Sequence, residues 1–127
     1  MKIWKLKSFA RDARREGVEE RALELAARDV AAGHYEARLS ASIAKKRVAR
    51  KGAGKRGGFR TIVAFENRQR SLIIFLEIYA KSSKSNVTKK EIAAFETVAK
   101  SLLNATSDQI RTLIDTGAII EKVLDNE

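Results

Sequence analysis

The chain lacks cysteine and contains a single histidine, His34. Without cysteine it can form neither a disulfide framework nor a thiolate metal site. His34 has no carboxylate pair near it at the spacing of metal ligands, so we expect no metal site, no cofactor and no histidine catalysis. Long apolar runs are also missing. The longest, Leu72–Leu76, is far shorter than the roughly 20 residues of a membrane span.

Nothing in Met1–Arg15 resembles a secretion signal, so we expect a soluble protein of the cytoplasm. A length of 127 residues is that of one compact domain. We therefore predict a single domain over residues 1–127.

Acidic residues are absent from Arg38–Arg60, a stretch that holds nine lysines and arginines. Since the net charge of the whole chain is +10, almost all of it lies there. Such a concentration of one sign of charge indicates an anion-binding surface. Four glycines interrupt the stretch, which leads into the apolar alternation of Phe59–Phe65. The pattern favours a basic hairpin on a sheet and a polyphosphate partner, most plausibly RNA.

Apolar periodicity predicts a short strand at Ile3–Leu6 followed by two helices. Ser8 is expected to cap the first helix, which Gly17 ends, and the second helix covers Glu19–Ala32 up to Gly33.

Two capping-box patterns, Thr88 with Glu91 and Thr106 with Gln109, predict helices in the C-terminal third of the chain. The second of these helices should end at Gly117.

Between the two pairs of helices the apolar residues alternate with a period of two. This predicts strands at Ile43–Arg50, Phe59–Glu66 and Ser71–Tyr79, a turn at Asn67–Arg70, and a last strand at Ala118–Leu124. The fold class is therefore α+β, with N-terminal helices packed on a small antiparallel β-sheet and C-terminal helices after it.

The residues Gly52-Ala53-Gly54-Lys55-Arg56-Gly57 match the letters of the dinucleotide fingerprint GxGxxG. That chemistry needs a helix N-terminus after the glycines, whereas Phe59–Val63 continues as a strand. We interpret the glycines as a loop that carries Lys55 and Arg56.

Arg60 lies inside the best predicted strand and needs a partner, because a guanidinium on a sheet is costly to leave unpaired. A substrate phosphate and the carboxylate of Glu77 are both candidates. Lys45 and Arg47 lie two residues apart on the preceding strand and so point to one face, where they could join Arg60. Tyr79 and Lys81 repeat that spacing at the end of the central strand.

A face of cations and a phenol could cleave RNA, because the ribose 2′-OH is an internal nucleophile. Lys45, Arg47 and Arg60 would hold the phosphate, and Lys81 or Tyr79 would assist proton transfer. The predicted RNA-binding residues around them are Lys46, Arg50, Lys51, Lys55, Arg56 and Lys84. Composition alone favours the simpler alternative, a surface that binds nucleic acid without cleaving it.

Several of these segments resemble the RelE/ParE toxin superfamily, and most closely the HigB-like branch of RelE toxins. They are Lys45–Arg50, Gly54–Phe65 with the core GKRGGFR, Ile78–Ser82 and Asn86–Thr88, and the likeness extends to Ile3–Arg11 and Gly117–Glu121. It covers nearly the whole chain.

The resemblance implies a toxin of a type II toxin–antitoxin system that enters the ribosomal A site and cuts mRNA, leaving a 2′,3′-cyclic phosphate. Its partners would be the ribosome, mRNA and a cognate antitoxin of the helix-turn-helix type. Lys45 and Arg47 match the family's paired basic residues, and Arg60 matches the arginine of its glycine–aromatic–arginine motif. Lys81 or Lys84 stands in place of a further arginine, and no tyrosine follows the central strand.

Two alternatives remain open at this point. The ParE side of the superfamily shares the fold and poisons DNA gyrase without being an enzyme, and an inactive RNA-binding relative is also compatible with the sequence.

Overall fold

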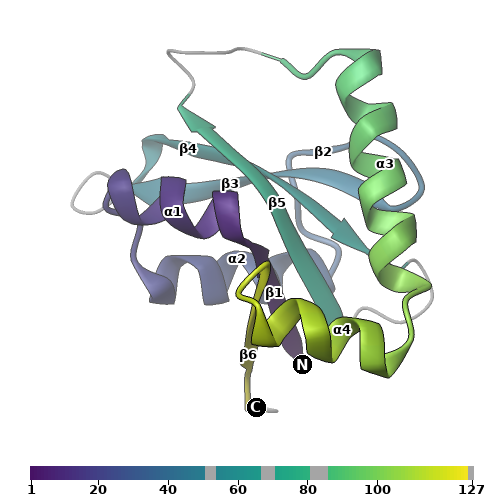
Figure 1. Ribbon diagram of the computed structural model, residues 1–127. Coiled ribbons are helices and arrows are strands. Elements are labelled where there is room, and N and C mark those ends of the chain that lie inside the picture. The colour runs from purple at the N-terminus through teal and green to yellow at the C-terminus, as the bar shows by residue number, and fades with distance from the viewer. Residues whose placement is uncertain (51–53, 67–70, 81–85, 126–127) are drawn as a thin grey trace.

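The computed structural model describes residues 1–50, 54–66, 71–80 and 86–125 of the chain. They form one sheet with helices on both faces (Figure 1). Across the sheet the strands run in the order β2-β3-β4-β5-β1-β6. The elements in chain order are β1 (Lys2–Leu6), α1 (Lys7–Arg15), α2 (Glu20–Ala31), β2 (Ala37–Arg38), β3 (Ile43–Arg50), β4 (Gly54–Phe65), β5 (Leu72–Ala80), α3 (Lys89–Leu103), α4 (Ser107–Asp115) and β6 (Ile119–Val123).

The α+β class is confirmed, and the antiparallel meander is the one formed by β3, β4 and β5. Both capping boxes form, with the side chains of Thr88 and Thr106 each accepting a backbone N–H three residues on. Gly17, Gly33 and Gly117 have positive φ after α1, α2 and α4, as their positions predicted. No helix in the described ranges has the length and apolar character to cross a membrane.

Some local expectations were wrong. Ser8 lies inside α1 rather than at its cap, because β1 runs directly into the helix and the Lys7 N–H bonds to the Ala118 carbonyl instead. Lys55 and Arg56 belong to β4, which starts at Gly54, and not to a loop. The predicted turn Asn67–Arg70 lies outside the described residues.

One strand pairing also departs from the antiparallel expectation. β1 pairs with β5 in parallel, with Lys2 opposite Leu72. Parallel neighbours need a long connection between them, and here two helices and three strands intervene along the chain. The sequence pattern of β1 carries no sign of which strand it will join.

The core has two layers, one on each side of the sheet. On the side that we call the α2 face, Val63 and Phe75 pack with Ala27 of α2, and α1 joins the same layer. On the α3 face, Ile62 and Leu76 belong to the cluster that includes the buried residues of α3. The inner strands β3, β4, β5 and β1 therefore bury residues on both faces, and α3 crosses the sheet on the side opposite to α2 (Figure 1).

The alternation of β5 changes once, at a bulge. Val63 is paired with Phe75, but the preceding residue of β4, Ile62, is paired with Glu77. Leu76 is thus the extra residue, and beyond it the odd-numbered side chains of β5 point to the opposite face of the sheet. As a result Tyr79 joins the cluster of the α3 face, on the opposite side to Phe75.

Ion pairs fasten α2 to three strands of the sheet. Glu20 binds Lys5 of β1 at 2.7 Å, Glu24 binds Lys122 of β6 at 2.8 Å, and Asp29 binds Lys46 of β3 at 3.1 Å. The hydrogen bond that Lys122 donates to the Glu24 carboxylate also raises the pKa of the Lys122 ammonium. The acids of α2 therefore neutralise three lysines that the strands direct toward the α2 face.

Removing the carboxylate of Asp29 should destabilise the fold, because the Lys46 side chain is buried and would lose its counter-charge. We expect Asp29→Ala to lower the free energy of unfolding by about 1–3 kcal/mol. Lys46→Met should lower the free energy of unfolding less, since it removes the buried positive charge that needs Asp29 as its counter-charge. Urea-induced unfolding measures both changes.

The control for this experiment is Asp12→Ala, since Asp12 contacts only the exposed side chains of Arg11 and Arg15 in its ion pairs. Its loss should cost less than about 1 kcal/mol. Equal stability of Asp29→Ala and Asp12→Ala would contradict the structural importance of the Lys46 pair.

Candidate active site

The central feature of the α3 face is a row of three side chains across three neighbouring strands. Arg47 of β3 is paired directly with Arg60 of β4, and Arg60 is paired directly with Tyr79 of β5. Residues opposite one another in an antiparallel sheet have Cβ atoms about 4.5–5.5 Å apart and lie on the same face. The sheet register therefore brings two guanidinium groups and a phenol together.

A second row lies next to the first. Lys45 is paired with Ile62, and Ile62 is paired with Glu77. Lys45 and Glu77 thus flank the row on the same face, two residues from Arg47 and Tyr79 along their own strands. We call the five polar residues Lys45, Arg47, Arg60, Glu77 and Tyr79 the Arg60 cluster.

Arg60 differs from the other buried cations in its lack of a counter-charge. The buried lysines Lys5 and Lys46 are each paired with a carboxylate of α2. Arg60 is only 9% exposed, yet within the described part of the chain it takes part in no ion pair. A buried guanidinium is strongly unfavourable in that state. Of its two predicted partners, Glu77 is not one in this structure.

Arg47 adds to the unbalanced charge. Its backbone N–H donates to the Glu36 carboxylate, but its side-chain Nε is buried and has no hydrogen-bond partner among the residues described. Two arginines directly opposite each other repel, because like charges on paired strands are destabilising. Arg47 and Arg60 together therefore form a site that an anion would stabilise.

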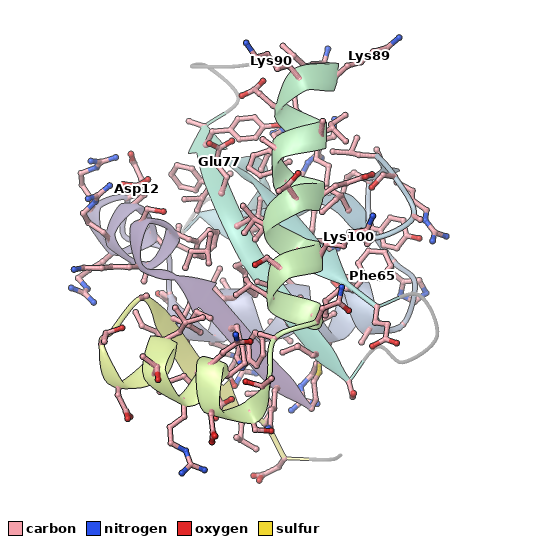
Figure 2. All side chains as sticks on the ribbon, turned by 45° about the vertical axis from the view of Figure 1, so that its right-hand side comes forward. Asp12, Phe65, Glu77, Lys89, Lys90 and Lys100 are labelled. Atoms are coloured by element: carbon pink, nitrogen blue, oxygen red, sulfur yellow. The ribbon has the colours of Figure 1, made fainter. Side chains whose placement is uncertain are left out.

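Figure 2 shows where this face lies relative to α3. In this view Glu77 is at the level of the N-terminal half of the helix, Lys89 and Lys90 are at its first turn, and Lys100 is toward its other end. Helix α3 covers part of the sheet face through Ala99 and Leu102, which are buried in the same cluster as Ile62 and Tyr79.

Not all of the predicted RNA-binding residues belong to this face. Lys46 points to the α2 face, where it is 3% exposed and bound to Asp29, so it is removed from the proposed RNA contacts. Arg38 also lies apart from the cluster, with its guanidinium 5.8 Å from the centre of the Phe65 ring. The charge run of the sequence is therefore divided between the two faces.

For some of the other predicted residues only the position of the backbone is described, and the rest lie outside the described residues. Arg50 ends β3, and Lys55 and Arg56 lie in the first part of β4. Lys51, Lys81 and Lys84 lie outside the described residues. His34 is exposed just after α2, and no group of three potential metal ligands occurs among the residues described.

Glu77 is the residue of the cluster whose place the sequence did not reveal. The sequence indicates Glu77 only as a partner of Arg60, because the bulge that directs its side chain to the α3 face has no mark in the sequence. The available signal was its composition, since Glu77 is the one acid in the otherwise apolar strand LIIFLEIYA.

A separate hollow of about 670 Å³ lies at another part of the molecule, between β1, the end of α3 and α4. Its lining includes Trp4, Leu102 and Ile114 and none of the Arg60 cluster. The cluster itself lies on a sheet face, apart from this hollow.

Residues 1–122 match the family described as the RelE toxin of the RelE / RelB toxin–antitoxin system. No curated protein shows a significant match. The matched region contains every helix and all but the last residue of β6, and it includes the whole Arg60 cluster. The chain therefore belongs to the RelE toxin family.

Proposed function

We propose that this RelE-family toxin is a ribosome-dependent endoribonuclease that cuts mRNA and so inhibits translation. The observation that carries the proposal is Arg60, a buried guanidinium that forms no ion pair with a described carboxylate and lies directly opposite a second arginine. A phosphodiester of RNA supplies the missing negative charge and accepts paired N–H donors from the guanidinium plane.

In this proposal Arg47 and Arg60 bind the scissile phosphate and stabilise the extra negative charge that develops on it. Donors fixed before the reaction are effective because they need no reorganisation in the transition state. Lys45 contributes a further positive charge from the same face. Tyr79 or Lys81 gives a proton to the departing 5′ oxygen. These side chains can neutralise the phosphate charge themselves, so we propose that the reaction needs no metal ion.

The proposed partners follow from the family and from the charge. A RelE-family toxin has a cognate antitoxin, and we propose one of the helix-turn-helix type. An acidic surface of that antitoxin would be complementary to the Arg60 cluster and would keep it from RNA. The substrate is mRNA on the ribosome, which places the activity in the cytoplasm.

Purified toxin added to translating ribosomes should cut the mRNA at codons in the A site. Primer extension would locate the cuts, and end analysis should find a 2′,3′-cyclic phosphate on the upstream product and a 5′-hydroxyl on the downstream one. Intact mRNA combined with loss of DNA supercoiling by gyrase would instead support the ParE-like alternative.

Arg60→Met should separate activity from stability. We expect cleavage to fall about 10²–10³-fold, the usual effect of removing one fixed donor to a developing oxyanion. The free energy of unfolding should stay equal or rise, because a flexible apolar side chain replaces a buried charge that has no counter-charge. Single-turnover cleavage and urea unfolding measure the two quantities.

Arg38→Met is the matched control for Arg60→Met, because Arg38 lies over the Phe65 ring and apart from the cluster. It should cleave at the wild-type rate. A large loss of stability in Arg60→Met would show that Arg60 has a structural role instead.

Neighbouring lysines on opposite faces offer a second test. Lys45→Met should reduce the dependence of RNA affinity on salt by about 0.7 in log–log slope, the value for one phosphate contact on a single strand. Lys46→Met should leave the slope unchanged, since that side chain is bound to Asp29 on the α2 face. Equal slopes for the two variants would place the RNA elsewhere.

A further inference from the structure

The bulge in β5 determines which face receives Glu77. Without the extra residue, the pairing of Val63 with Phe75 would continue to Ile62 with Leu76 and Thr61 with Glu77. Thr61 is fully buried on the α2 face and donates its hydroxyl to the Lys46 carbonyl. The observed register instead pairs Glu77 with Ile62 on the α3 face.

The same shift carries Tyr79 into the row with Arg47 and Arg60. One irregularity therefore delivers both an acid and a phenol to a face that otherwise presents cations. Bulges are common next to active sites, where they redirect a side chain. A strand with unbroken alternation would have left the Arg60 cluster with positive charges only.

Cleavage by the ribose 2′-OH requires a group that takes up its proton. Arginine, lysine and tyrosine side chains carry their own protons at neutral pH, and they are donors in that form. A carboxylate is ionised at neutral pH and accepts protons. Among the five residues of the Arg60 cluster, Glu77 is the one whose ordinary form can act as a base.

We propose that Glu77 is the general base of the cleavage reaction, an assignment that rests on the proposed function. Its carboxylate takes the proton from the 2′-OH while the 2′ oxygen forms a bond to phosphorus. The bond from phosphorus to the 5′ oxygen breaks, and that oxygen receives a proton from Tyr79 or a lysine. The products are a 2′,3′-cyclic phosphate and a 5′-hydroxyl, and Glu77 later returns its proton to water.

The test compares Glu77→Gln with wild type in single-turnover cleavage of ribosome-bound mRNA. Glutamine keeps the size and polarity of the side chain but cannot take up the proton. We expect a loss of about 10²–10⁴-fold, the usual contribution of a positioned base. Glu66→Gln is the matched control, since Glu66 is exposed and directly follows the last residue of β4. This variant should cleave at the wild-type rate.

The pH profile separates a base from a residue that only supports the fold. The wild-type rate should rise with pH until the carboxyl group is ionised and then level off, and Glu77→Gln should lack this rise. Glu77→Asp should retain the rise at a lower rate. Equal thermal unfolding of Glu77→Gln and wild type would establish that the loss is not one of folding.

A substrate with sulfur in place of the bridging 5′ oxygen distinguishes a base from an acid, because a thiolate leaves without needing a proton. Glu77→Gln should remain slow on this substrate, whereas Tyr79→Phe should recover. If Glu77→Gln regained a fast rate on the sulfur substrate, or cleaved ordinary mRNA at the wild-type rate, the assignment of Glu77 as the base would be overturned, but the proposed function would not. Absence of cleavage by the wild-type toxin would overturn the proposed function itself.

Discussion

The ion pairs between α2 and the sheet determine how charge is distributed over this molecule. Glu20, Glu24 and Asp29 bind one lysine each, on β1, β6 and β3. Their carboxylates are thereby committed to one face of the sheet, where they hold α2 in place and neutralise the cations beneath it. Lys45, Arg47 and Arg60 lie on the other face. A basic surface thus arises in a chain that contains many acids.

That surface is maintained against a thermodynamic cost. Arg47 and Arg60 are direct neighbours of like charge, and Arg60 is almost entirely removed from water. The fold tolerates them because its two apolar layers, built around residues such as Val63 and Ile62, supply stability elsewhere. Sites with unbalanced charge of this kind are expected where a ligand completes the balance, and they illustrate why function and maximal stability diverge.

Local patterns predicted most of the elements but not their long-range relations. The alternation of β3 and β4 correctly placed Lys45, Arg47 and Arg60 on one face, because period-two facing is a local property. It could not show that Asp29, on the preceding helix α2, would bind Lys46. The facing of Tyr79 depends on a bulge that arises from pairing between two strands, and the parallel joining of β1 to β5 likewise depends on tertiary contacts rather than on propensity.

The position of β1 within the sheet has a consequence for how the toxin comes into being. This first strand lies between β5 and β6, so its two neighbours come from the middle and the end of the chain (Figure 1). During synthesis β1 can pair with β5 only after more than half of the polypeptide exists, and its other edge stays open until Ile119–Val123 have emerged. Contacts so distant in sequence form late and slowly. The sheet is therefore complete only when β6 has paired with β1, so its first strand waits for a partner that is made much later.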